Sequence, residues 1–255
     1  HQGLRWVGLV SALCVSGAGK AQDSAGDMFK FRGFGTLGAV RSSEKNGDFQ
    51  ANFSLPNGAG FTRELDVRAV SRLGLQVNGR FSEAFSGVVQ VISEARYDKT
   101  FTPYVSMAHL KWQAMPQLAI RAGRIPLPTY LISDYQKVGY STPWVRPPTE
   151  VYQFNPLTFC DGGDVVWKSH LGGMALSVFG LYGTTRADLP AGEGESTFKG
   201  KNLITLGLTG EVGSSVWRVA YMQLSATLVD TDLDAPDGPY ALLRTLPAAY
   251  GGNPA

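Results

Sequence analysis

The sequence predicts an all-β protein, and three observations support that prediction. Charged residues make up only 17% of the 255-residue chain, whereas 44% are hydrophobic and 31 residues are glycine. Stretches of about 8–14 residues alternate polar and apolar side chains, which is the periodicity of a strand with two different faces. The connections between these stretches alternate between long and short. Together these features predict an antiparallel up-and-down transmembrane β-barrel, because a sheet in a bilayer must pair all its backbone groups.

The first 21 residues predict a cleaved signal peptide. Arg5 precedes an apolar run at residues 6–15, and small residues lead to a plausible cleavage position after Ala21. The run is too short to span a bilayer, and a first helix of the domain is the alternative reading. Removing residues 1–21 takes away Arg5 and Lys20 and no acidic residue, so the net charge of +2 falls to zero. We therefore expect export through a signal peptide.

Residues 22–255 are assigned to one β-barrel domain. Long connections at 42–64, 125–162 and 186–201 alternate with short ones, which places tight turns at one end and extended loops at the other, as in outer-membrane barrels. Bacterial barrels have an even number of strands, so nine predict the N-terminal part of a larger barrel of about sixteen. The nine predicted strands are Phe29–Arg41, Leu65–Asn78, Ala84–Arg96, Tyr104–Met115, Gln117–Arg124, Gly163–Lys168, Gly173–Thr185, Asn202–Glu211 and Ser215–Thr227.

Each predicted strand has an apolar face and a polar face. Within Leu65–Asn78, for example, Leu73 and Leu75 alternate with Arg72 and Gln76. We expect the apolar faces to contact lipid and the polar faces to line a water-filled lumen. The polar faces carry more basic than acidic residues, which predicts a mild preference for anions.

No sequence motif points to catalysis or to a cofactor. Gly33, Gly35 and Gly38 form a GxGxxG pattern, but it lies inside a predicted strand and not at the strand-to-helix turn that binds dinucleotides. No pattern of Ser, His and Asp residues predicts a nucleophile and its base. A net charge of +2 without a basic block gives no support for nucleic-acid binding. The sequence therefore predicts no enzyme, no cofactor, no metal site and no nucleic-acid partner.

The long connection at 125–162 is the most distinctive part of the chain. It contains six prolines and many aromatic residues, so we expect it to fold and to narrow the lumen. Its sequence RAGRIPLP…SDY…VGYSTPWVRPPTEVY, with FxFxGFGTLG in the first strand and LGLQV in the second, resembles the general porins of Gram-negative bacteria. The resemblance covers roughly residues 29–225. It implies an often trimeric outer-membrane channel, surrounded by lipid and lipopolysaccharide, for passive diffusion of small hydrophilic solutes.

The resemblance also implies a constriction at which acidic residues of the inward-folded loop face basic residues of the wall. Carried over by position, the loop acids are Asp134, Glu150 and Asp161. The wall bases are Arg68, Arg72, Arg96, Lys111 and Arg121.

Three other functions are compatible with parts of this pattern. A barrel with an occluded lumen would serve as a structural anchor or adhesin, and this is the main alternative. A barrel-embedded hydrolase and a secreted sandwich or lectin are the others. Of these, the absent catalytic pattern disfavours the hydrolase, and the regular alternation of connection lengths disfavours the sandwich.

Overall fold

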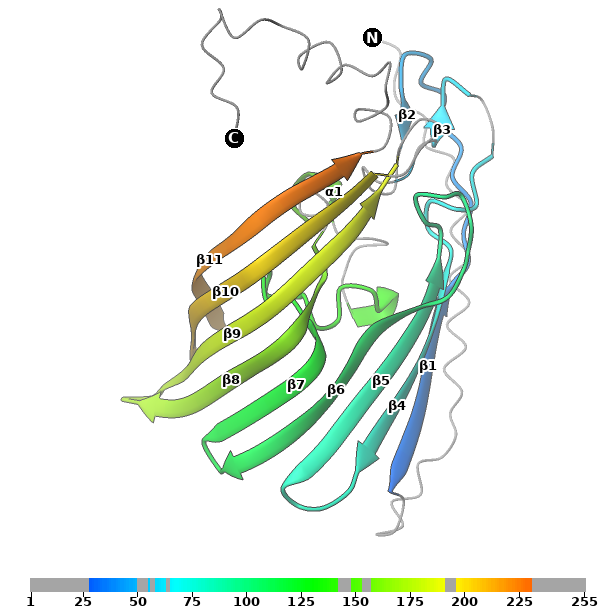
Figure 1. Cartoon of the computed structure of the whole chain (residues 1–255). Helices are drawn as coiled ribbons and strands as arrows, with labels where there is room; N and C mark the ends of the chain where they lie inside the picture. Colours follow the sequence, from blue (N-terminus) through cyan, green and yellow to red (C-terminus); the bar gives the residue numbers. More distant parts are fainter. Residues whose placement is uncertain are drawn as a thin grey trace, which may run out of the picture.

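The computed structural model describes residues 28–49, 55, 58–62, 65–141, 148–152, 157–190 and 196–230. The predicted signal peptide lies outside these residues. Nine long strands form one antiparallel sheet in which each strand pairs with its neighbours along the chain (Figure 1). They are β1 (Phe29–Thr36), β4 (Arg72–Arg80), β5 (Phe85–Glu94), β6 (Tyr104–Met115), β7 (Leu118–Pro126), β8 (Phe159–Leu171), β9 (Met174–Leu189), β10 (Ser196–Val212) and β11 (Ser215–Asp230).

The predicted all-β fold and its up-and-down strand order are confirmed, and every predicted strand overlaps an observed one. The sheet order runs from β1 to β11 without a crossover. Within the described residues β1 and β11 are not paired with each other, so these strands form an open, curved sheet and not a closed barrel. Strands β9 and β10 are longer than predicted, and they shorten the connection expected at 186–201 to residues 190–195.

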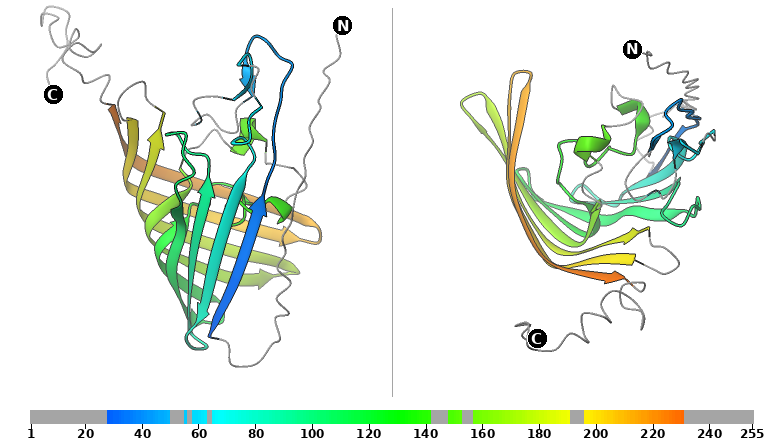
Figure 2. Two further views of the ribbon diagram at one scale, coloured as in Figure 1. Left: turned by 90° about the vertical axis from the view of Figure 1, so that its right-hand side faces the viewer. Right: turned by 90° about the horizontal axis from the view of Figure 1, so that it is seen from above.

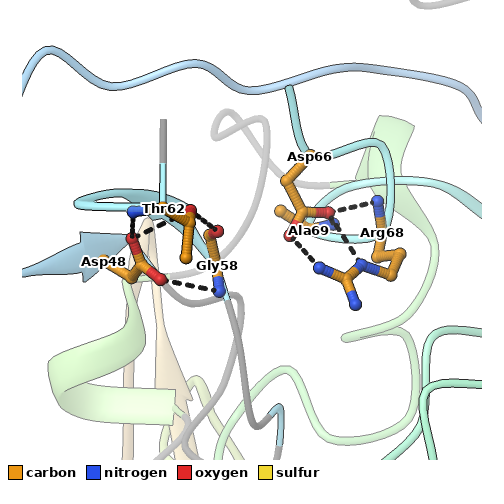
Figure 3. A network of polar contacts seen from close by, with 6 residues as sticks. All are labelled: Asp48, Gly58, Thr62, Asp66, Arg68 and Ala69. Atoms are coloured by element: carbon orange, nitrogen blue, oxygen red, sulfur yellow. Dashed lines mark hydrogen bonds and ion pairs between the residues drawn. The ribbon is translucent and has the colours of Figure 1, made fainter. Parts of the chain in front are cut away.

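The second strand of the sheet begins at Arg72 and not at Leu65, where the alternation predicted it. The cause is a local hydrogen-bond network around Asp66 (Figure 3). Its carboxylate accepts the backbone N–H groups of Arg68 at 2.6 Å and Ala69 at 3.2 Å. An aspartate that binds the backbone two and three residues ahead stabilises a turn in place of a strand.

A small hairpin that the sequence did not predict lies in the connection between β1 and β4. Its strands are β2 (Asp48–Phe49) and β3 (Ala59–Gly60). The Asp48 carboxylate accepts hydrogen bonds from the backbone of Gly58 and from the backbone and hydroxyl of Thr62 (Figure 3). Leu55, Ala69, Val70 and Ala95 form a separate apolar cluster in this region. The predicted loop therefore folds into a structured cap.

Tight turns join the strands at the end of the sheet opposite this cap (Figure 1). The turn between β8 and β9 uses Gly172 and Gly173 at φ values of 55° and 84°, and the turn between β10 and β11 uses Gly213 at 56°. These are left-handed conformations that glycine adopts without steric cost and that match the twist of a two-residue hairpin. Alternating long and short connections are thus a real feature of the fold.

The sheet has a concave face and a convex face, and the connection between β7 and β8 lies on the concave side (Figure 2). Arg72 and Glu94 are paired across β4 and β5 and both contact this connection, so their side chains define the concave face. The adjacent Leu73 faces the opposite side and is 58% exposed. The alternation predicted from the sequence is therefore the alternation between these two faces.

Candidate functional site

The candidate site is the concave face together with the β7–β8 loop, which we define as residues 127–158. Described parts of this loop include a single 3₁₀ turn, η1 (Gly139–Ser141), and a four-residue helix, α1 (Thr149–Tyr152). Both lie within the curve of the sheet when it is viewed from above (Figure 2). The described parts of the connection predicted at 125–162 therefore lie on the polar side of the sheet. The connection is slightly shorter than predicted, because β7 extends to Pro126 and β8 begins at Phe159.

One side of the loop is bound to β4, β5 and β6 through Lys137. The Lys137 Nζ atom lies 2.5 Å from Glu94 Oε1, and the Lys137 carbonyl accepts a hydrogen bond of 3.3 Å from Arg72 Nη1. The same Glu94 carboxylate accepts the Tyr104 hydroxyl at 2.7 Å and lies 3.7 Å from Arg72 Nε. This cluster joins one loop residue to three strands of the wall.

The other side of the loop is bound to β11. Arg218 Nη1 donates a 2.9 Å hydrogen bond to the carbonyl of Tyr130, and Arg218 Nε donates one of 2.9 Å to Thr209 Oγ1 of β10. The Arg218 guanidinium also lies 5.4 Å from the ring centroid of Phe179. Because Lys137 and Tyr130 are held on β5 and β11 respectively, the loop crosses the concavity from one flank to the other.

Apolar packing fixes the base of the loop. Leu127 and Leu157 are almost fully buried against Cys160 and Leu181, with Leu203 completing the cluster. The Leu127 N–H also donates a 3.0 Å hydrogen bond to the carbonyl of Thr158, which closes the loop where β7 ends and β8 begins. Burying two leucine side chains contributes roughly 1.5–3 kcal/mol for each of them. The loop is therefore part of the folded core of the concave side.

Two tyrosines stabilise the interior of the loop itself. The Tyr130 and Tyr152 rings meet edge to face with centroids 5.0 Å apart. Burial, and then the neighbouring Tyr152, raises the pKa of Tyr130 above its ordinary value. The contact between these two rings therefore joins the two ends of the described loop segments to each other.

The wall below the loop carries a row of charged side chains on neighbouring strands. Arg121 of β7 donates hydrogen bonds from Nε at 3.0 and 3.1 Å and from Nη2 to the carboxylate of Asp164 on β8. Lys111 of β6 is the cross-strand partner of Arg121 in the register. No ion pair of Lys111 is found within the described strands and loops. Among these charged side chains of the wall, the ammonium group of Lys111 is therefore the one that is not paired with an acidic residue.

The structure separates the wall bases that the sequence assigned together. Arg72, Lys111 and Arg121 lie on strands of the sheet and share its concave face. Arg68 is not on a strand, because a turn at Asp66 replaces the predicted one. The Arg68 Nη2 atom lies 3.0 Å from Asp66 Oδ2. Arg96 follows the end of β5, where its Nη2 lies 3.6 Å from Asp188 Oδ2 of β9.

The three predicted loop acids also have different locations. Asp134 lies in the loop and is close enough to Arg121 to interact with it electrostatically. Glu150 lies in α1, and its side chain is outside the described part of the structure. Asp161 is not in the loop, because β8 begins at Phe159. It lies an odd number of residues from Asp164 and so faces the convex side, where it binds Arg124 at 2.7 and 2.8 Å.

Sequence reasoning missed the most important loop charge, which is Lys137. The sequence contains no pattern that identifies Lys137, because the direction of a side chain can be predicted from alternation only within a strand. Its pairing with Glu94 reverses the expected arrangement, since here a base of the loop contacts an acid of the wall. Among the loop side chains that the structure describes, Asp134 near Arg121 follows the expected polarity.

The loop packs closely against the wall. One pocket of about 40 Å³ lies between them, lined by Gln90, Tyr104, Ser106, Asp134 and Tyr152 among others. That volume holds a few water molecules and no larger solute. In the parts of the chain that the structure describes, no group of three or more His, Cys, Asp or Glu side chains is arranged to hold a metal ion.

The convex face is apolar and exposed from one flank of the sheet to the other. Side chains of separate strands are largely accessible there: Phe31 is 78% exposed, Leu75 61%, Leu110 59%, Leu206 58% and Val219 67%. A soluble monomer rarely exposes a contiguous apolar patch of more than a few hundred Å². A search of the described helices finds none that is long and apolar enough to cross a membrane.

The chain was also compared with known proteins. It matches no protein-family model, no curated protein and no solved structure. The functional assignment therefore depends on the geometry described above.

Proposed function

We propose that this chain forms the wall of an outer-membrane porin, a water-filled channel through which small hydrophilic solutes diffuse passively. The observation that carries the proposal is the contrast between the exposed, apolar convex face and the polar concave face of one up-and-down sheet. In a bilayer the convex side chains contact lipid and the concave ones contact water. The partners would be outer-membrane lipid and lipopolysaccharide, and the assembly a homotrimer.

In this proposal the β7–β8 loop is the constriction. It is held on β5 through Lys137 and on β11 through Arg218, so it narrows the channel at a fixed position. The loop acts by size exclusion and by its electric field, and no covalent chemistry takes place. The proposal therefore assigns no catalytic residue, no metal and no cofactor.

Close packing of the loop supports a second candidate function. Because the loop is bound to β5 and β11 and its base is packed on the concave face, a barrel whose lumen it fills would serve as a structural anchor or adhesin. The two functions differ in one measurable property, which is the conductance of the channel.

Releasing the loop tests the constriction. We expect the double variant Lys137→Met and Arg218→Met to raise single-channel conductance in planar bilayers, because the hydrogen bonds it removes contribute about 2 kcal/mol together. That energy shifts a loop equilibrium roughly 30-fold toward the released state. Arg186→Met, which removes an exposed pair with Asp188, is the control and leaves conductance unchanged. A wild-type chain that inserts but does not conduct supports the anchor.

Lys111 is expected to set the ion preference of the channel, because the other predicted bases are paired with acids. Reversing its charge with Lys111→Glu changes it by two units and shifts the anion-to-cation permeability ratio toward cations by up to about fivefold for each unit, the effect of one charge at contact distance in water. Reversal potentials in a KCl gradient measure this ratio. Lys45→Glu makes the same charge change in the exposed cap and serves as the control. An unchanged ratio in Lys111→Glu would contradict the assignment.

A further inference from the structure

A patch of hydrogen-bond donors lies on the concave face near the tight turns. The register aligns Arg80 of β4 with Ser86 of β5, and Ser86 with Lys111 of β6. Arg80 shares the concave face with Arg72, because an even number of positions separates them in one strand. Neighbouring strands are about 4.8 Å apart, so the Cα atoms of Arg80 and Lys111 lie about 10 Å apart on either side of Ser86. Two long cationic side chains therefore flank one small hydroxyl side chain.

Neither cation of this patch is offset by an acidic side chain in the part of the chain that the structure describes. No ion pair or side-chain hydrogen bond of Arg80 or Lys111 is found there. The next residue of the same cross-strand row is Arg121, and its charge is offset by Asp164. Among the described residues, the patch therefore has two positive charges without a counter-charge.

Asn78 adds a further donor beside the two cations. It lies two residues before Arg80 in β4 and so faces the same side of the sheet. Its Oδ1 accepts a 2.8 Å hydrogen bond from Gln76 Nε2, so its Nδ2 group, on the other branch of the amide, is turned away from Gln76. Nδ2 is buried, and no acceptor for it is found among the described residues. Because a buried donor without an acceptor costs free energy, this position is incomplete without a ligand oxygen.

A chain of hydrogen bonds across three strands fixes the orientation of the Asn78 amide. Ser106 Oγ of β6 donates to Gln90 Oε1 of β5 at 2.6 Å, and Gln90 Nε2 donates to Gln76 Oε1 of β4 at 2.8 Å. Gln76 then donates to Asn78, so each amide passes its hydrogen bond on in the same direction. Reversing one amide would break the hydrogen bonds on both sides of it. Asn78 therefore presents its N–H donors at the end of the chain.

The chemistry of the patch fits a phosphate group. A guanidinium, an ammonium, an amide N–H₂ and a hydroxyl group all donate hydrogen bonds, and no carboxylate lies among them. Arginine and lysine are the side chains that bind phosphate oxygens most strongly. A phosphate monoester has close to two negative charges at neutral pH, which matches the two cations. A carboxylate or a chloride ion has one charge and would offset only one of them.

The patch is separate from the constriction that the β7–β8 loop forms. Glu94, which binds Lys137 of the loop, is at the far end of β5 from Ser86. Eight positions separate Ser86 from Glu94, which is about 26 Å along the strand. A solute that has passed the loop would therefore meet the patch as a second position along the wall.

We propose that Asn78, Arg80, Ser86 and Lys111 bind the phosphate group of small solutes inside the channel. The inference rests on the proposed function, which makes the concave face the wall of a water-filled lumen. Arg80 and Lys111 supply the charge, and Ser86 lies between them as a short donor. Asn78 completes the site, since a phosphate oxygen would be the acceptor that its buried N–H₂ group lacks.

Isothermal titration calorimetry of the full chain in detergent tests this binding. Inorganic phosphate is one probe, and glycerol phosphate, which carries the same group on a small organic solute, is the other. We expect saturable binding by the wild type, and the probe that binds more tightly identifies the source of the phosphate group. Acetate, with one charge fewer, binds about fivefold more weakly. Arg80→Gln and Lys111→Gln each lower the phosphate affinity about fivefold, the effect of one charge at contact distance in water.

Asn78→Asp tests the amide donor. The aspartate keeps the size of the side chain and an oxygen that accepts from Gln76. It replaces the Nδ2 donor by a second acceptor and adds a negative charge. We expect the phosphate affinity to fall more than about tenfold, because one hydrogen bond is lost and one repulsive charge is added.

Lys168→Gln is the matched control. Lys168 lies on the same concave face, four residues after Asp164 in β8. The register puts its Cα atom about 16 Å from that of Lys111, beyond the Debye length of about 10 Å at 0.1 M salt. We expect this variant to bind phosphate as the wild type does. An equal loss of affinity in Lys168→Gln and Arg80→Gln would overturn the inference, because it would show a diffuse positive field and not a site.

Single-channel conductance separates this inference from the proposed function. A wild-type chain that conducts but shows no saturable binding of either phosphate would overturn the inference and leave the porin assignment in place. Acetate binding as tight as phosphate binding would also overturn it. Phosphate binding by a wild-type chain that inserts without conducting would support the site and overturn the proposed function.

Discussion

Replacing Leu206 with arginine is expected to destabilise the folded sheet by about 2–4 kcal/mol in phospholipid vesicles, the cost of a basic residue near the bilayer midplane of a β-barrel. Leu206 lies near the middle of β10, on the convex face, and is 58% exposed. The same substitution on a surface that faces water changes stability by no more than about 0.5 kcal/mol. Urea unfolding followed by tryptophan fluorescence measures the difference.

Ser215→Arg is the matched control for this variant. Tyr221 of β11 is the cross-strand partner of Leu206, so the two side chains lie on the same face of the sheet. Ser215 is six residues from Tyr221 in the same strand and therefore also lies on this face. It begins β11 next to the tight turn, where the cost of arginine falls to about 0–1 kcal/mol. Equal stability of Leu206→Arg and the wild type would show that the convex face does not contact lipid.

Asp164→Asn, on the concave wall, is expected to lower the free energy of unfolding by an amount comparable to that of Leu206→Arg. The Asp164 side chain is only 4% exposed and that of Arg121 23%, and they form several hydrogen bonds. Removing one partner of a buried ion pair costs about 3–5 kcal/mol. Because Arg121 retains some contact with water, we expect about 2–3 kcal/mol in the same unfolding measurement, together with a stronger preference for anions.

A second substitution separates the effect of the ion pair from that of packing. The double variant Arg121→Gln and Asp164→Asn leaves no uncompensated charge and is expected to recover most of the lost stability. Arg186→Gln removes a pair whose arginine is 59% exposed and provides the comparison for an exposed ion pair. A neutral effect of Asp164→Asn would mean that the pair does not stabilise the wall.

Local periodicity was sufficient to predict most of the fold. Tyr104–Met115 was predicted with the bounds that the structure shows, because its polar and apolar residues alternate up to clear turn signals. The error at Leu65–Ser71 has a specific cause. The alternation there is as regular as in a strand, but the Asp66 carboxylate binds the following backbone and forms a turn. Hydrogen bonds from one side chain to the nearby backbone override a pattern of hydrophobicity.

The candidate site was less predictable than the strands around it. Strand alternation assigned Arg72, Lys111 and Arg121 to the polar face, and the register places them on the concave wall. Alternation does not show which side chains form ion pairs. It therefore did not distinguish Arg121, which is paired with Asp164, from Lys111. It also gave no direction for Lys137, whose contact with Glu94 joins residues 43 positions apart. Ion pairs between a loop and a distant strand depend on the finished curvature of the sheet.

The meander has a consequence for how the chain reaches its final state. Each of the nine long strands pairs with the next of them along the chain, and the tight turns of β4–β5, β6–β7, β8–β9 and β10–β11 let these four hairpins form their hydrogen bonds without closing a long loop. The contact between Arg218 and Tyr130 is different, because 88 positions separate the two residues. It forms only after β11 has joined the sheet. The constriction is therefore expected to be the last element to assemble, and its immobilisation would be a kinetic marker that the wall is in place.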